Sequence, residues 1–245
     1  PYVPISLNPD GAMFLGVHVD YNEANAALVN FTGGVIFERS AKLAKPDMES
    51  VLPFIQSTAT RIKARSTPDQ RARFQGIGLS LGHGFLGRDD SVSHWREIES
   101  SLQGLSASLD LAIYVSTDAI SACSAELIYG LGSGVSDFLY VFIDESVSGG
   151  LVQDGRIRFS RDDAGASLGK VLVPGADGRM VPLTTLAPGS IAQAPSTQSL
   201  ELLSRGLAYA VTSAAAVVHY RTVILDGTIS SVALQQITVK LRAAL

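Results

Sequence analysis

The sequence predicts an α/β protein made of two lobes, and two observations support this. Three strands followed by alternating helices and strands are expected twice, once before and once after about residue 118. Such alternation favours largely parallel sheets covered by helices. Hydrophobic residues form 46% of the 245 residues and charged residues 17%, which is typical of a globular chain with a sizeable core. We expect lobes over residues 1–117 and 118–245.

The first half opens with a Pro/Asn-rich segment, Pro1–Gly11, which is too turn-prone for a stable element. Phe14–Asp20 alternates apolar residues with others, as a half-buried strand does. Ala24–Val29 and Gly34–Phe37 complete a meander of three strands. The remaining elements expected in this half are a helix over 52–62 capped by Ser50, a strand over 75–81, a helix over 98–109 and a strand over 111–115.

The second half begins with a helix over Ala119–Tyr129, ended by Gly130. Phe138–Ile143 is predicted as a buried strand, and the Asp154–Gly155 turn signal predicts a hairpin over residues 151–159. The other elements expected here are a turn-rich segment over 144–150, a short strand ending at 174, a loop over 180–198, a helix over 200–218, a strand over 222–225 and a helix over 234–245.

Charge and cysteine content exclude several classes of function. The net charge is −4, so these residues present no electrostatic footprint for nucleic acid. The single cysteine, Cys123, excludes an internal disulfide and a cysteine cluster for zinc, and we expect it buried in a helix. The apolar run 207–225 contains His219 and Arg221 and divides into a helix and a strand. A membrane span is therefore not expected, and a cytoplasmic setting is.

Two stretches, Phe138–Gly175 and Leu7–Gly11, carry a resemblance to the ROK family of repressors, open reading frames and sugar kinases. Phe138–Gly175 is similar to the family's order of strand, glycine-rich turn, strand, D/N-G turn and sugar motif, and Leu7–Gly11 is similar to a linker of its regulators. The resemblance covers nearly the whole chain and implies the two-lobed actin-like ATPase (ribonuclease H-like) fold, with a cleft between the lobes. Segment 180–198 is shorter than in the family, and the family's closing strand and helix are not found before Leu245.

The nucleotide motifs implied by the resemblance are degenerate. Asp20-Tyr-Asn22-Glu-Ala replaces Asp-x-Gly-Gly-Thr, so both glycines are missing and a carboxylate would face phosphate. The second loop keeps Gly149 and Gly150 but adds acidic residues, and the adenosine-side strand ends in Asp-Gly-Thr. We interpret both loops as strand-connecting turns with solvated acids. No ATP binding and no cofactor are therefore expected.

The family's sugar-binding positions are partly retained. Thr117-Asp118 replaces the Asn-Asp pair that contacts sugar and supplies the general base in ROK kinases. Asp118 also suits the N-terminus of the following helix as a cap, and the two roles are compatible. Gly82-His83-Gly84 matches the segment at the cleft floor, so His83 and Gly84 are further ligand candidates.

The family's Glu-x-Gly-His sugar motif aligns with Ser167-Leu-Gly-Lys170. Without the histidine and with no cysteine nearby, no zinc site or other metal site is expected. Lys170 would suit an anionic or oxidised sugar, or else it is a solvated loop residue.

The favoured function is the sugar- or sugar-derivative-sensing body of a ROK-type transcriptional regulator without enzymatic activity. Such a body is expected to be a homodimer that contacts DNA only through a helix-turn-helix domain before Pro1, because palindromic operators match two-fold protein symmetry. The alternatives are a ROK sugar kinase with atypical phosphate loops, which would phosphorylate a hexose with ATP, and a dimer scaffold that binds no ligand. The sugar, the operator and the sign of regulation do not follow from the sequence.

Overall fold

A computed structural model describes residues 5–86, 92–158, 168–187 and 195–245. The chain divides into two compact units, Pro1–Asp118 and Ala119–Leu245, which are called unit 1 and unit 2 below. Both contain helices and strands, so the predicted α/β class is confirmed.

The sheet of unit 1 has five strands in the order β3-β2-β1-β4-β5. The predicted meander is present as three antiparallel strands, and two further strands extend it in parallel to β1. The strands are β1 (Met13–Asp20), β2 (Glu23–Asn30), β3 (Val35–Lys42), β4 (Phe74–Leu81) and β5 (Ala112–Thr117).

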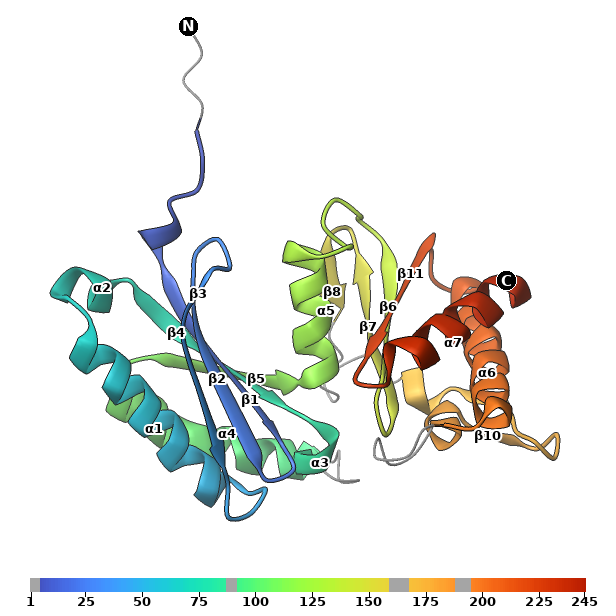
Figure 1. The fold of residues 1–245 in the computed structure, drawn as a ribbon, viewed down its shortest axis with the longest axis horizontal. Coiled ribbons are helices and arrows are strands. Elements are labelled where there is room, and N and C mark those ends of the chain that lie inside the picture. Colours follow the sequence, from blue (N-terminus) through green and yellow to red (C-terminus); the bar gives the residue numbers. More distant parts are fainter. Residues whose placement is uncertain (1–4, 87–91, 159–167, 188–194) are drawn as a thin grey trace, which may run out of the picture. The chain divides into compact units, whose positions relative to one another are not determined.

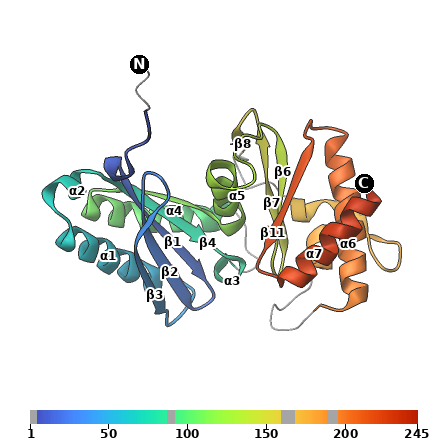
Figure 2. The same cartoon turned by 45° about the horizontal axis from the view of Figure 1, so that its top comes forward.

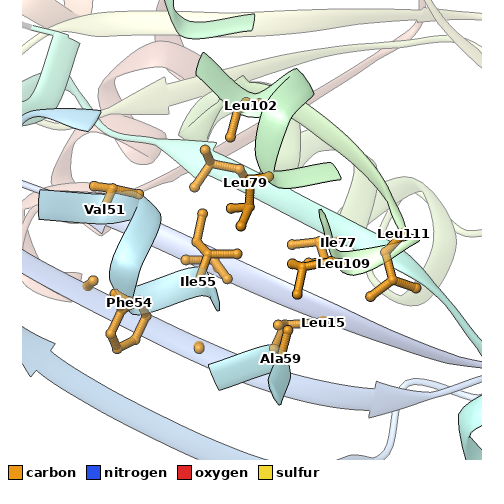
Figure 3. Packing of buried hydrophobic residues seen from close by; sticks show 14 of the residues in the cluster. Leu15, Val51, Phe54, Ile55, Ala59, Ile77, Leu79, Leu102, Leu109 and Leu111 are labelled. Carbon is orange, nitrogen blue, oxygen red and sulfur yellow. The ribbon is translucent and has the colours of Figure 1, made fainter. Parts of the chain in front are cut away.

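Two long helices, α1 (Met48–Arg65) and α4 (Val92–Leu109), lie on the same face of this sheet (Figure 1). The apolar side chains of that face interdigitate with the helices, as Leu15, Ile55 and Ile77 show in Figure 3. The cap predicted at Ser50 is wrong, because the Asp47 carboxylate accepts the Ser50 N–H at 2.9 Å and the helix begins at Met48. Three short elements were not predicted: η1 (Pro9–Gly11), α2 (Pro68–Ala72) and α3 (His83–Leu86).

The main sheet of unit 2 has the order β11-β6-β7-β8. Its strands are β6 (Phe138–Ile143), β7 (Val147–Gln153), β8 (Arg156–Arg158) and β11 (Thr222–Gly227). The hairpin around Asp154–Gly155 is confirmed, and both residues have positive φ, 53° and 67°. Phe159, predicted as its last residue, lies outside the described residues. The turn-rich segment predicted to reach residue 150 is too long, because β7 begins at Val147.

Helices cover both faces of the unit 2 sheet (Figures 1 and 2). On one face lies α5 (Asp118–Tyr129), and on the other lie α6 (Thr197–Ala215) and α7 (Ser231–Ala244). All six β6 residues are buried. Phe138, Tyr140 and Phe142 pack against α5, whereas the residues between and after them, Leu139, Val141 and Ile143, pack against α6 and α7. A continuous apolar strand is expected when both faces of a sheet are covered.

The beginning of the loop predicted over 180–198 forms regular elements instead. There β10 (Met180–Pro182) pairs with β9 (Leu172–Pro174), and η3 (Leu183–Leu186) places two buried leucines in the unit 2 core. Burial of these apolar side chains explains the departure from the Pro/Ser/Thr pattern. The helix predicted over 200–218 is α6, which begins at Thr197 and ends at Ala215. No described helix is long and apolar enough to cross a membrane.

The two units repeat one topology. The strand order β8-β7-β6-β11 of unit 2 matches β3-β2-β1-β4 of unit 1, with two antiparallel pairings followed by one parallel pairing in each. The predicted duplication is therefore present. In open α/β sheets ligands bind beyond the carboxyl ends of the strands, so this edge of each unit is the first place to search for a site.

Candidate functional site

Parallel strands bring most of the candidate residues of unit 1 to one edge of its sheet. Val19 of β1 pairs with Leu81 of β4, and Leu81 pairs with Thr117 of β5, so the three strands end together. The residues at and after these ends include six sequence-predicted positions: Asp20, Asn22, His83, Gly84, Thr117 and Asp118. These residues come from three separate parts of the chain, and only the parallel register brings the strand ends together.

Asp20 ties the end of β1 to the segment after β4. Its Oδ1 accepts the N–H of Gly84 at 2.7 Å and the N–H of Tyr21 at 3.1 Å. The N–H of Gly82 donates to the carbonyl of Val19 at 2.8 Å. Asp20 is half-buried and its carboxylate accepts backbone N–H groups of the protein, so the expectation of a solvated acid is wrong for this residue.

The glycines on either side of His83 are required by this contact. A Cβ at Gly82 would lie 2.6 Å from Cγ of Asp20, and a Cβ at Gly84 would lie 2.4 Å from Cδ2 of Tyr21. Real Cβ atoms essentially never approach so closely, so the Asp20–Tyr21 pair can pack here only against glycine. The half-buried His83 therefore lies between two glycines whose backbones pack against Asp20 and Tyr21.

The first degenerate phosphate loop is a tight hairpin turn. Asp20 pairs with Glu23, leaving Tyr21 and Asn22 as the connection, and Tyr21 has φ of 46°. The carbonyl of Asn22 accepts the N–H of Leu43 at 2.7 Å. The prediction of a strand-connecting turn is confirmed for this segment.

Thr117 and Asp118 stand at the junction of β5 and α5. Thr117 is the last strand residue, Asp118 the first helical residue, and both are half-buried. A carboxylate in the first turn of a helix is stabilised by the N–H groups and dipole there. A half-buried carboxylate and hydroxyl at a strand end are groups that can pair with ligand hydroxyls.

The corresponding edge of unit 2 contains acids with structural roles. Asp144 follows β6, is 6% exposed, and its Oδ1 accepts the N–H of Ser146 at 2.6 Å and its hydroxyl at 2.8 Å. The expectation of solvated acids is therefore wrong for Asp144. The carboxylate closes its own three-residue turn, since Ile143 pairs with Val147.

Gly149 and Gly150, predicted as remnants of a phosphate loop, lie inside β7 and not in a loop. They pair with Val141 and Tyr140 of β6. A Cβ at Gly149 would lie 2.2 Å from the carbonyl oxygen of Tyr140, and one at Gly150 would lie 2.7 Å from Sγ of Cys123. Close packing explains both glycines without a phosphate.

Asp226, at the end of β11, was not predicted as a paired residue. Its Oδ2 accepts the hydroxyl of Tyr140 at 2.6 Å and its Oδ1 accepts the N–H of Gly227 at 2.7 Å. Burial, together with this hydrogen bond, raises the pKa of Tyr140 well above its usual range. In the sequence, only Tyr140 within the buried strand indicated a polar partner, because buried tyrosine hydroxyls usually form a hydrogen bond.

The remaining candidates lie elsewhere in unit 2. Lys170 is exposed at the end of η2 (Leu168–Lys170), while Ser167 lies outside the described residues. Cys123 is buried in α5 as expected, and burial, with a smaller contribution from Glu126, raises its pKa to about 12. Among the described residues no group of three or more His, Cys, Asp or Glu side chains is placed to hold a metal ion.

Known proteins with this architecture are found by structure and not by sequence. No family model and no curated protein matches the chain. A ROK hexokinase from Thermus thermophilus superposes with a TM-score of 0.72 at 18% identity, over 95% of this chain and 89% of that one. The chain has the fold of ROK proteins. Its two units match the two-lobed actin-like class implied by the sequence.

Both kinds of ROK protein are among the similar structures. A ROK transcriptional regulator, described as a homologue of the E. coli MLC protein, has a TM-score of 0.68 at 17% identity, over 97% of this chain and 69% of that one. A ROK glucokinase from Streptomyces griseus, solved with glucose and AMPPNP, has a TM-score of 0.68 at 14% identity, over 95% of this chain and 88% of that one. At these identities the likeness establishes the fold alone.

Proposed function

We propose that this chain is a ROK-family protein and forms the sugar-sensing body of a transcriptional regulator that binds no nucleotide. The observation that carries the proposal is the strand-end edge of unit 2. There, Gly149 and Gly150 are packed inside β7, Asp144 closes its own turn, and the Asp226 carboxylate is paired with Tyr140. A phosphate-binding loop needs glycine backbone N–H groups that face the ligand, and carboxylates at the same edge would repel it.

The edge of unit 1 is the proposed place for sugar hydroxyls. The half-buried Asp118 and Thr117 offer acceptors and a donor, and His83 lies in the turn that Asp20 holds. Few polar groups at fixed positions beside apolar surface are typical of small-molecule sites. The exposed Lys170 of unit 2 is retained as a proposed contact for an anionic group, to be tested by its own variant.

Binding measurements test this function directly. Isothermal titration calorimetry would use AMPPNP with Mg²⁺, and separately glucose, N-acetylmannosamine and glucuronate. We expect sugar binding without nucleotide binding, and a loss of about tenfold or more in sugar affinity in Asp118→Asn, which removes one charged acceptor. Asp69→Asn, an exposed acid on α2, is the matched control. Micromolar AMPPNP affinity would reject the proposal.

The regulator also requires a dimer and a DNA-reading domain. We propose that the protein is a cytoplasmic homodimer. Its DNA contacts would come from a domain outside these residues, because a body with net charge −4 repels the phosphates of DNA. Light scattering should give twice the mass of the chain, and an operator shift assay on residues 1–245 should show no specific binding. A monomer at micromolar concentration would contradict the dimer.

A ROK sugar kinase is the second candidate. The chain spans 89% of the Thermus thermophilus hexokinase but only 69% of the regulator, and Asp118 occupies the general-base position implied by the family pattern. A coupled assay for sugar-dependent ADP release separates the two. Turnover that disappears in Asp118→Asn would favour the kinase, whereas no ADP release with any sugar that binds favours the sensor.

A further inference from the structure

Tyr21 is an aromatic residue at the unit 1 edge that none of the roles above uses. The residue is 46% exposed, and its φ is 46°. A bulky residue rarely adopts positive φ, and such strain persists only where the surrounding structure imposes it. Strained residues cluster at ligand sites, so the exposed and strained Tyr21 beside Asp20 is a candidate for ligand contact.

The position of the ring is set by the segment after β4. A Cβ at Gly84 would lie 2.4 Å from Cδ2 and 2.5 Å from Cγ of Tyr21, so the base of the ring is packed against the glycine backbone. The Gly84 N–H in turn donates to Asp20 at 2.7 Å. Asp20, Tyr21 and Gly84 therefore form one interlocked unit, which leaves almost half of the tyrosine surface exposed.

We propose that Tyr21 is a ligand-contacting residue whose ring stacks on the apolar face of a cyclic sugar, and that Asp20 is the positioning residue that holds it there. This inference rests on the proposed sugar-sensing function and names how the same site selects its ligand. A pyranose has a C–H face as well as hydroxyls. An aromatic ring covers the C–H face, while fixed polar groups nearby pair with the hydroxyls.

Replacing Tyr21 by glycine gives the sharpest test, because glycine suits a φ of 46° and the fold should not be lost. Calorimetry with glucose, N-acetylmannosamine and glucuronate should show about tenfold weaker binding in Tyr21→Gly, as expected for an aromatic anchor. Tyr21→Phe, which keeps the ring, should remain within about threefold of the wild type. The matched control is Phe31→Ala, a 43% exposed aromatic residue that follows the other end of β2.

Asp20 variants test the positioning role separately. Asp20→Asn keeps an oxygen that accepts the Gly84 N–H and should bind sugar nearly as the wild type does, whereas Asp20→Ala should be about as weak as Tyr21→Gly. In Asp20→Ala, a further Tyr21→Gly substitution should then cost little, because the ring is already displaced.

The outcomes separate the two claims. If the wild type binds a sugar and Tyr21→Gly binds it within twofold, with an unchanged melting temperature, the stacking role is overturned while the proposed function stands. If the wild type binds no sugar of the panel, both are rejected. A loss of affinity in Phe31→Ala equal to that in Tyr21→Gly would also overturn the inference, because the effect would then not be local.

Discussion

The two units form equivalent turns after their first strands, yet they stabilise them differently. In unit 1 the Asp20 carboxylate accepts an N–H from Gly84, a residue 64 positions away. In unit 2 the Asp144 carboxylate accepts from Ser146, two positions away. One carboxylate thus accepts a hydrogen bond from beyond the neighbouring strand end, whereas the other accepts one from within its own turn.

The backbone arrangement beneath these side chains is the same in both units. The Val19 carbonyl accepts the N–H of Gly82 at 2.8 Å, and the Ile143 carbonyl accepts the N–H of Thr228 at 3.1 Å. The repeated topology therefore determines where strand ends meet. The side chains placed on it determine which residue each carboxylate bonds to, and in this the two units differ.

The largest expected effect concerns the strand end of unit 2, which depends on a glycine. Gly227 has φ of 153°, and a Cβ there would lie 1.9 Å from the Ile143 carbonyl oxygen. Gly227→Ala should therefore lower the free energy of unfolding by about 3 kcal/mol or more. Urea denaturation followed by circular dichroism measures it.

The control is Gly78→Ala in β4, where nothing lies within 4 Å of the added Cβ. This change should be neutral within about 1 kcal/mol. Equal losses from both variants would show that the close approach at Gly227 does not constrain unit 2.

A smaller effect is expected from the two carboxylates. Asp20→Ala should lower the free energy of unfolding of unit 1 by about 1–2 kcal/mol, because the Gly84 N–H loses its acceptor. Amide hydrogen exchange should quicken at Gly84 in Asp20→Ala and at Ser146 in Asp144→Ala.

Trp95, the single tryptophan, lies in α4 and reports on unit 1 by its fluorescence. Its urea transition should shift in Asp20→Ala and recover in Asp20→Asn. Unchanged exchange at Ser146 in Asp144→Ala would contradict the role of this carboxylate in closing its turn.

The smallest effect is the pH dependence of the α1 cap. Hydrogen bonds from the backbone and side chain of Ser50 lower the pKa of Asp47 below its ordinary value. The folded state therefore favours the ionised carboxylate, and its stabilising contribution is present above the ordinary pKa of about 3.9 and is lost as pH falls through the lower folded value.

Asp47→Asn keeps a capping oxygen but does not titrate. Between about pH 5 and pH 2 the stability of unit 1 should decline less in Asp47→Asn than in the wild type, as urea titrations with Trp95 fluorescence can measure. Identical pH profiles would show that the cap contributes nothing through its charge.

Much of the fold was determined by local pattern. Alternation over Phe14–Asp20, the Asp154-Gly155 turn and the long apolar helix over 200–218 each predicted an element that the structure contains, because periodicity and turn chemistry act within a few residues. The duplicated order of strands and helices, read from the sequence alone, also predicted the two-unit architecture.

Element boundaries and side-chain partners depended on the tertiary structure. Gly149 and Gly150 follow a turn in sequence, but their pairing with β6 places them inside a strand, and their role is visible only against Tyr140 and Cys123. Met180–Leu186 opens the Pro/Ser/Thr-rich stretch that predicted a loop over 180–198, yet pairing with β9 and burial of two leucines give it regular structure.

By itself the sequence determined the fold class, the loss of phosphate-loop glycines at residues 22 and 23 and the candidate residues at the unit 1 edge. Only the tertiary structure decided that Asp20 holds the Gly82–Gly84 segment and that Tyr140 pairs with Asp226. The physical reason is separation along the chain. These contacts join residues 64 and 86 positions apart, and such partners meet only after parallel strands align.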